Sequence, residues 1–285
     1  MILDIFFANS FTFYLFALFL GLIVGSFLNV VVHRLPKMLE NEWTAFAREQ
    51  LNLPAEATPN MSLWQPASHC PHCQSTIRRR HNIPVLGFVW LGGRCACCQQ
   101  PIARHYLLLE VLTGALFVLM AWLFGASVYT VFAWLFASFL LAAAWIDAQT
   151  QLLPDSLTLP LLWLGLLYHA LFEPQQLSDS VLAAVCAYLF LWTLNAIHKK
   201  LRGIDGMGGG DAKLFAALGA CLGVFSLPLI MFAAAVGTLI AAAVLGKQKN
   251  QAIAFGPALA VCGLAYCLLE PTLIAHFAAW LFSGY

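Results

Sequence analysis

Two aspartates stand where long apolar segments meet polar sequence, and together they are suited to acid–base chemistry. Asp211 follows the glycine run Gly206-Met207-Gly208-Gly209-Gly210 and leads into an apolar segment, whereas Asp147 closes an earlier apolar segment. Two carboxylates can divide the work of acid and base when their surroundings favour different protonation states. Such a pair can hydrolyse a peptide bond without a metal or a covalent nucleophile. We therefore expect Asp147 and Asp211 to form one catalytic site.

The positions of these two acids suggest different roles. A carboxylate at a helix C-terminus opposes the macrodipole by about 0.3–1 kcal/mol, whereas one at an N-terminus is favoured. Asp147 ends its predicted helix and Asp211 begins one. On this basis Asp211 is the base that activates water and Asp147 the acid that protonates the carbonyl or the leaving amine. A pair that shares a proton also permits the reverse assignment.

The glycine run supports a role for this region beyond starting a helix. Each glycine loses more backbone freedom on folding than any other residue. The missing side chains would let an extended peptide lie against the backbone. A nucleotide loop is not expected, because G-x-x-x-x-G-K-[ST] is absent and no soluble strand precedes the run. We expect supporting or substrate-binding roles for Gly206, Gly208, Gly210 and Lys213.

Asp155 is a third acid in the same part of the chain. It follows Leu152-Leu153-Pro154 and precedes an apolar segment, so it is well placed to cap that helix. We expect capping rather than catalysis. If Asp147 is not the partner of Asp211, Asp155 is the next candidate.

Two C-x-x-C pairs predict a structural metal site. Cys70 and Cys73 form the first pair, and Cys95 and Cys98 form the second. The separation slightly exceeds the usual gap of roughly 15–20 residues, but the pattern is that of a tetrahedral four-cysteine zinc site. Metal binding can supply the folding energy that so small a loop lacks. Disulfides are the alternative, and cytoplasmic placement of the loop argues against them.

The fourth ligand of this site has alternatives. Cys97 stands beside Cys98, and the C-x-x-C spacing favours Cys98. His69 and His72 flank the first pair and could substitute for a cysteine. The cysteines of the apolar segments are expected to be buried small side chains without chemistry.

Composition places the chain in the membrane. Residues are 61% hydrophobic and only 9% charged, whereas about a quarter are charged in soluble domains. A spanning helix needs roughly 20 mostly apolar residues. We predict an all-α polytopic membrane protein of about eight transmembrane helices with a cytoplasmic zinc-ribbon-like loop domain after the first helix. The predicted spans are 11–32, 107–124, 128–146, 157–172, 180–197, 213–226, 229–246 and 252–269.

The basic residues predict the orientation of these spans. All 14 Lys and Arg residues fall in loops on one side of an eight-span arrangement, and such loops are cytoplasmic. Both termini are then outside. The expected parts are a first helix at 1–33, a cytoplasmic four-cysteine domain at 34–106 and a transmembrane peptidase core at 107–285. The bilayer is a partner, and no nucleic-acid partner is expected.

The first span has further features. Gly21 and Gly25 form a small-xxx-small pair that allows another helix to approach closely. The segment ending in Pro36 is expected to end the span, and residues 37–65 to include a short amphipathic helix. Asn29 is expected either to bridge helices or to lie near the active site. Glu110 is expected either to pair with a nearby arginine or to be functional.

The combination of motifs resembles the type IV prepilin peptidases, bacterial membrane aspartyl proteases of the G-x-G-D class. The resemblance covers nearly the whole chain. The motifs that carry it are Gly25-Ser26-Phe27-Leu28-Asn29, both C-x-x-C pairs, Ile146-Asp147, Leu153-Pro154-Asp155, the glycine run through Asp211-Ala212-Lys213 and Phe255-Gly256-Pro257.

The resemblance implies a function and a location. Asp147 and Asp211 are implied to be catalytic, with Asp155 adjacent but not catalytic. The family cleaves the basic leader of prepilins and pseudopilins at the cytoplasmic face of the bacterial inner membrane. Its full-length members also methylate the new N-terminus with S-adenosylmethionine, for which the loop near Gly92 and Gly93 is the implied region. The alternatives are a peptidase without methyl transfer and a non-enzymatic secretion or transport scaffold.

Overall fold

The computed structural model describes residues 10–54, 61–203, 208–244 and 254–282. Regular structure in these ranges is helical, apart from two isolated β-bridges in the cysteine loop. The chain divides into two compact units, Met1–Thr130 and Val131–Tyr285. We describe each unit by itself.

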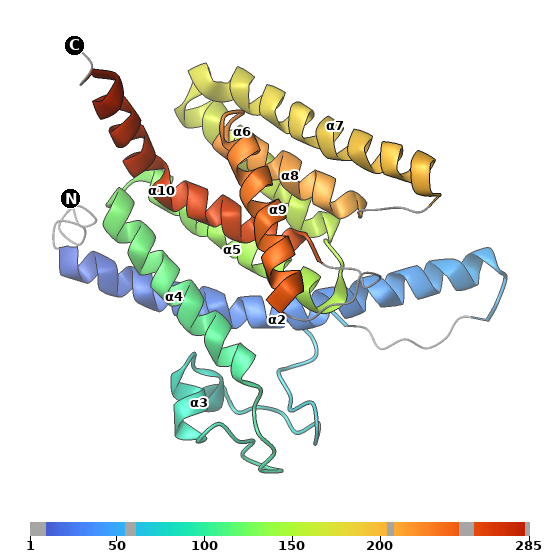
Figure 1. Ribbon diagram of the computed structural model, residues 1–285. Helices are drawn as coiled ribbons and strands as arrows, with labels where there is room; N and C mark the ends of the chain where they lie inside the picture. Colours follow the sequence, from blue (N-terminus) through green and yellow to red (C-terminus); the bar gives the residue numbers. More distant parts are fainter. Residues whose placement is uncertain (1–9, 55–60, 204–207, 245–253, 283–285) are drawn as a thin grey trace. The chain divides into compact units, whose positions relative to one another are not determined.

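Two long helices form the frame of the first unit. Helix α2 (Ser10–Gln50) packs against α4 (Arg104–Phe124), which crosses it in Figure 1. A Cβ added at Gly21 would come within 2.8 Å of the Gly114 Cα, and one at Gly25 within 2.7 Å of the Glu110 Cα. The predicted small-residue contact is therefore confirmed. The intervening loop carries the short helices η1 (Arg79–Asn82) and α3 (Leu86–Trp90).

The expected end of the first helix is wrong. Helix α2 continues through Pro36 to Gln50, so residues 37–50 do not begin a separate amphipathic helix. A proline inside a helix removes one backbone hydrogen bond. The residues that follow, such as Met38, Leu39 and Glu40, are strong helix formers, and the helix resumes after that loss.

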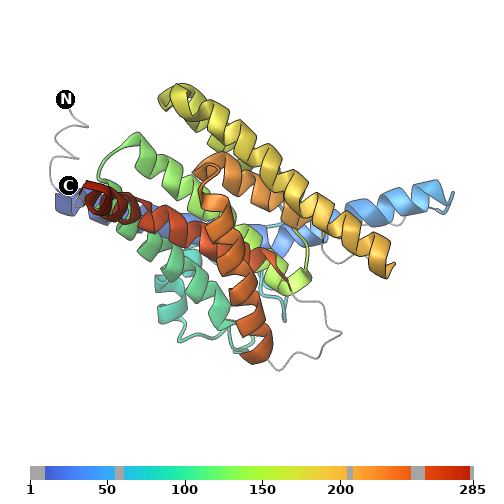
Figure 2. The same ribbon diagram turned by 45° about the horizontal axis from the view of Figure 1, so that its top comes forward.

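The second unit is built around a short helix. Its elements are α5 (Val128–Thr150, beginning just before the boundary), α6 (Asp155–Phe172), η2 (Pro174–Gln176), α7 (Leu177–Arg202), α8 (Gly209–Leu222), α9 (Ser226–Val244) and α10 (Gly256–Phe282). Helix α8 contacts α6, α7, α9 and α10, and Figure 2 shows α7 running beside it. From Asp211 to Leu222 nearly every side chain of α8 is buried.

Small residues allow α8 to occupy this central place. A Cβ at Gly165 of α6 would lie 2.7 Å from the Cys221 Sγ, and one at Gly219 would lie 2.8 Å from the Ala183 carbonyl oxygen of α7. Such contacts bring helix backbones close together. The N-terminus of α8, which carries Asp211, is thereby fixed among its neighbours.

The all-helical membrane architecture is confirmed. The eight predicted spans fall on α2 and α4 to α10, and the span 213–226 also reaches the first residue of α9. Among the described residues, six helices are long and apolar enough to cross a membrane: α2, α4, α5, α6, α7 with η2, and α9. Helix α8 and the described apolar part of α10, Gly256–Leu269, are shorter.

Candidate functional site

The structure brings the two predicted catalytic aspartates together. Asp147 lies in the last turn of α5 and Asp211 in the first turn of α8. Their side chains are only 4% and 8% exposed, and the two carboxyls are close enough to interact electrostatically. Both acids belong to the second unit. Two interacting buried carboxyls are the groups that acid–base hydrolysis needs.

One oxygen of each carboxyl has no hydrogen-bond partner within the described part of the chain. These atoms are Oδ2 of Asp147 and Oδ1 of Asp211, and both are buried. Buried polar atoms are nearly always paired, so an exception calls for an explanation. A site that binds water and a peptide carbonyl supplies one, because both oxygens are then used in proton transfer.

Leu153 packs against the glycine run. A Cβ added at Gly210 would lie 2.6 Å from the Leu153 Cβ and 3.2 Å from the Leu153 carbonyl oxygen. Glycine is therefore required at the residue directly before Asp211. By contrast, a Cβ at Gly209 would meet no atom within 4 Å. Gly208 is the N-cap residue of α8 with extended backbone, and Gly206 lies outside the described residues.

The glycine at the start of α10 has a similar role toward the other acid. A Cβ at Gly256 would lie 2.6 Å from the Asp147 Oδ2 and 3.0 Å from the Leu153 Cδ1. Leu153 thus lies against both Gly210 and Gly256, and Gly256 lies against Asp147. Glycine in the Phe255-Gly256-Pro257 motif is therefore explained by its close contacts with Asp147 and Leu153, which the spacing of the motif does not reveal.

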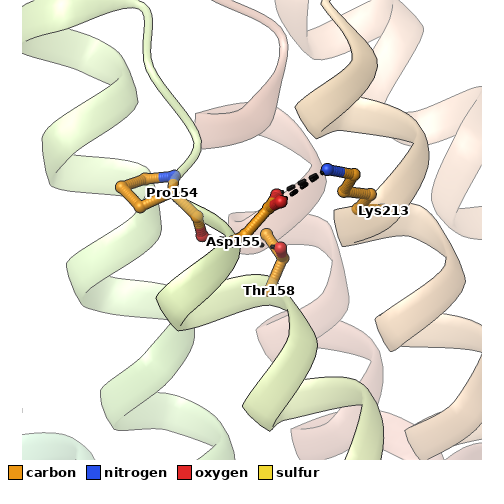
Figure 3. Close-up of polar contacts among 4 residues, drawn as sticks. All are labelled: Pro154, Asp155, Thr158 and Lys213. Carbon is orange, nitrogen blue, oxygen red and sulfur yellow. Dashed lines mark hydrogen bonds and ion pairs between the residues drawn. The ribbon is translucent and has the colours of Figure 1, made fainter. Parts of the chain in front are cut away.

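Asp155 does not cap α6, contrary to our expectation. It is the first helical residue, Pro154 occupies the N-cap position, and no side chain makes a capping hydrogen bond there. Instead, Lys213 Nζ lies 2.6 Å and 2.8 Å from the two Asp155 carboxylate oxygens. Figure 3 shows this ion pair joining the first turns of α6 and α8. Lys213 therefore positions the helix that carries Asp211.

The four predicted metal ligands also come together. The Sγ atoms of Cys70, Cys73, Cys95 and Cys98 all lie within 4.8 Å of one another. Cys70 and Cys98 are 3.8 Å apart, and Cys73 and Cys95 are 4.0 Å apart. A tetrahedron with metal–sulfur bonds of about 2.3 Å has edges of about 3.8 Å. The cluster therefore fits a tetrahedral metal ion, and its cysteines are free thiols.

The two cysteine pairs are built alike. Gln74 N–H donates to the Cys70 carbonyl, and Gln99 N–H donates to the Cys95 carbonyl. Both glutamines have positive φ, 57° and 58°. The repeat C-x-x-C-Q-x-x-I is visible in the sequence at 70–77 and 95–102, but our reading of the spacing missed it. Cys97 is exposed. Cys97, His69 and His72 do not belong to the cluster.

Hydrogen bonding prepares this loop to bind a cation. The Ser75 side chain and backbone lower the pKa of the Cys73 thiol to about 6, with the Ser75 hydroxyl 3.0 Å from the sulfur. The backbone N–H groups of Cys98 and Cys97 lower the pKa of Cys95. The thiolate is the form that binds metal, so these contacts favour that form at Cys73 and Cys95. At Cys98 the Gln100 backbone acts to lower the pKa, but burial and the other three cysteines raise it to about 12.

Other polar residues of the first unit make structural contacts. Asn29 Nδ2 donates to the Tyr106 carbonyl at 3.0 Å, which supports the expectation that it bridges helices. Glu110 Oε2 accepts a hydrogen bond from the Val85 N–H at 2.8 Å. Gly92 and Gly93 have φ of 57° and 71° in the turn after α3. This backbone conformation is sufficient to explain why glycine is found at both positions. Their binding of a methyl donor remains a prediction.

Two buried carboxyls, one in the last turn of α5 and one in the first turn of α8, are the arrangement expected of a membrane aspartyl peptidase. The chain belongs to the type IV leader peptidase family. The model of that family matches residues 134–246, and the model of the bacterial peptidase A24 N-terminal domain matches residues 19–124.

Curated relatives agree with this assignment. The chain is 48% identical over 246 residues to a prepilin leader peptidase/N-methyltransferase of Neisseria gonorrhoeae, covering 86% of each chain. It is 44% identical over 275 residues to that of Stutzerimonas stutzeri, covering 95% of each. Identity to that of Dickeya chrysanthemi is 44%, over 90% of this chain and 93% of the relative. No solved structure matches the chain.

The two neighbouring glycines provide a matched test of the Leu153 contact. Gly210→Ala places a methyl group 2.6 Å from the Leu153 Cβ, and relief of such overpacking costs about 1–3 kcal/mol. We expect it to lower peptide cleavage at least about tenfold by moving Asp211. Gly209→Ala is expected to retain most activity. Equal losses in both variants would contradict the packing role, and thermal unfolding of each variant checks its stability.

The composition of the metal cluster predicts that substitutions of the adjacent residues Cys97 and Cys98 affect metal binding differently. We expect the wild type to bind one metal ion per chain. Cys98→Ser removes a ligand and is expected to lower the bound metal well below that content, because structural sites need all four ligands. Cys97→Ser is expected to retain it. Elemental analysis of the purified proteins measures both. Loss of metal in Cys97→Ser but not in Cys98→Ser would contradict the ligand assignment.

Proposed function

We propose that this protein cleaves the basic leader from type IV prepilins and pseudopilins and methylates the new N-terminal residue with S-adenosylmethionine. The observation that carries the peptidase assignment is the buried pair of carboxyls with one unpartnered oxygen each, Asp147 Oδ2 and Asp211 Oδ1. The family membership and the names of the relatives support the two activities.

Cleavage proceeds by general acid–base catalysis. One carboxylate takes a proton from water while the water oxygen bonds to the scissile carbonyl carbon. The other carboxyl gives its proton to the carbonyl oxygen, which leaves a tetrahedral gem-diol intermediate. The first carboxyl then passes the proton it took from water to the leaving nitrogen as the C–N bond breaks, and a hydroxyl proton of the intermediate returns to the second carboxyl. We assign Asp211 as base and Asp147 as acid, although a pair that shares a proton permits the reverse.

The glycines would let an extended substrate approach the acids. Gly208 and Gly209 carry no side chain at the N-terminus of α8, and a Cβ at Gly209 would meet open space. An extended peptide can lie close to such backbone. Its apolar helix would remain in the lipid while the basic leader stays in water. Lys213 supports this site through Asp155 rather than by binding the substrate.

Zinc is the metal that suits the four-cysteine cluster. Cys70, Cys73, Cys95 and Cys98 would hold it, since four thiolates at tetrahedral separations favour Zn²⁺. Bound zinc supplies folding free energy to the loop rather than catalysis. The peptidase acids lie in the other unit of the chain.

The protein is a multi-pass protein of the bacterial inner membrane with the loop on the cytoplasmic side. In the eight-span arrangement predicted from the sequence, all 14 basic residues fall on one side, and this supports the orientation. It puts residues 34–106 and the active site in or next to the cytoplasm and both termini outside. In the same proposal the loop domain at 34–106 includes the last part of α2, which runs to Gln50, and residues 107–285 form the transmembrane core.

Removal of each acid tests the peptidase proposal. Asp147→Asn and Asp211→Asn are expected to lower prepilin cleavage by about 10²–10⁴-fold, the usual contribution of acid–base catalysis. Asp155→Asn changes only an exposed ion pair, worth about 1 kcal/mol or less, and is expected to cost no more than about fivefold. Cleavage in detergent and N-terminal methylation of precleaved pilin, both read by mass spectrometry, measure the effects.

Methylation of precleaved pilin is the control for folding in these variants. We expect it to survive in all three, because it does not require the aspartates. Normal cleavage by Asp147→Asn would contradict the proposal that Asp147 and Asp211 act as a catalytic pair. Asp155 would then become the candidate partner of Asp211.

A further inference from the structure

The loop between α2 and α4 folds back toward the membrane. Val85, at the start of α3, donates its backbone N–H to Glu110 Oε2 at 2.8 Å. Glu110 lies six residues after Arg104, the first residue of α4. With a rise of about 1.5 Å per residue, this contact lies about 9 Å along α4 from its loop end. Figure 1 shows α3 beside this end of α4.

Helix α2 places the start of α3 at a similar level. Glu110 packs against Gly25, since a Cβ added at Gly25 would lie 2.7 Å from the Glu110 Cα. Gly25 precedes Arg34, a basic residue expected near the end of the span, by nine residues. This separation is about 13 Å along the helix axis. Both helices therefore put the start of α3 beside their membrane-embedded part and not beside their ends.

A second part of the loop lies along the same face of the membrane helix. Arg34 is buried and donates to the carbonyl oxygens of Ser62 at 2.9 Å and Pro66 at 2.6 Å, which holds this segment against α2. Between them, the Trp64 ring stacks on the Phe27 ring with centroids 5.9 Å apart, and both rings are exposed. Phe27 belongs to the predicted first span. Trp64 is therefore placed as an anchor at the membrane–water interface, where tryptophan is enriched.

Helix α3 presents an apolar surface at this level. Leu86, Val89 and Trp90 are 54%, 64% and 68% exposed. In α3, whose residues are all described, only Gly87 is buried. Exposed apolar side chains that lie together mark a surface that a partner or a membrane covers. A helix in the membrane interface buries its apolar side about 5–10 Å deep, which agrees with the level of α3.

The charge of the loop also favours a membrane surface over a basic peptide as the partner of α3. Between Glu56 and Glu110 the sequence contains five arginines and no Asp or Glu. Arg78, Arg80 and Arg94 are exposed and stand on both sides of α3 in the sequence. Arginine can bury its stem in apolar surroundings while its guanidinium reaches the headgroups. In the proposed orientation this leaflet is cytoplasmic, and its anionic lipids attract basic segments.

We propose that α3 is embedded in the leaflet on the loop's side of the membrane, with Leu86, Val89 and Trp90 against the lipid acyl chains. The bilayer itself covers this apolar surface. The loop is then attached to the membrane through α3 as well as through α2 and α4, so the four-cysteine cluster is held at the membrane surface. This inference does not depend on the peptidase or the methyl-transfer activity.

Fluorine NMR of the full-length protein, labelled with 5-fluorotryptophan and placed in lipid nanodiscs, tests the proposal. A nitroxide on the lipid acyl chain broadens the signals of rings in lipid, and a water-soluble gadolinium chelate broadens those of rings in water. Two exposed tryptophans are matched controls: Trp163 in the membrane helix α6, and Trp43 in the part of α2 beyond Pro36. We expect the nitroxide to broaden Trp90 and Trp163 alike and to leave Trp43 sharp, and the gadolinium chelate to do the reverse.

The three signals are assigned from the variants Trp90→Phe, Trp43→Phe and Trp163→Phe, each of which removes one of them. The test itself is read from the wild type, so it does not depend on how well a variant folds. Broadening of Trp90 by the gadolinium chelate to the same extent as Trp43 would overturn the proposal, because α3 would then face water. A Trp90 signal that neither reagent broadens would also overturn it, because another protein surface would then cover the ring.

Discussion

The structure depends on keeping two carboxyl groups buried beside each other. Burial of acids without full hydrogen bonding is unfavourable, and Asp147 and Asp211 each keep one unpartnered oxygen. Packing elsewhere must therefore hold them in place. Helix α8 does this through contacts with α6, α7, α9 and α10 along nearly its whole length. The free energy of helix packing thus offsets the unfavourable free energy of burying the two carboxyls.

The contacts that set the distance between the acids are made by residues without catalytic chemistry. Leu153 lies against Gly210 and Gly256, and Gly256 lies against the Asp147 carboxyl. Lys213 and Asp155 then join the first turns of α8 and α6. Three sequence motifs far apart in the chain therefore meet around one site. A rigid surrounding of this kind is what proton transfer between fixed groups requires.

The sequence predicted the helices and the reactive residues better than it predicted their contacts. Hydrophobic length identified the six described helices that are long and apolar enough to cross a membrane, and cysteine spacing identified the four sulfurs that cluster. Contacts between distant segments have no local pattern, so Asp155 was expected to cap α6 and its ion pair with Lys213 was not predicted. The continuation of α2 beyond Pro36 was missed because a proline near charged residues normally ends a span. Arg34 was counted only as an orientation signal, although it is buried.

The dependence of kcat/KM for leader cleavage on pH tests the central claim most directly. If one carboxyl must be ionised and its neighbour protonated, the profile is bell-shaped, with two limbs that belong to the pair. Methylation of precleaved pilin in the same samples reports whether the protein stays folded across the range. We expect a bell-shaped pH profile of kcat/KM for cleavage within the pH range in which methylation persists. A cleavage rate that changes in one direction only would contradict catalysis by the Asp147–Asp211 pair.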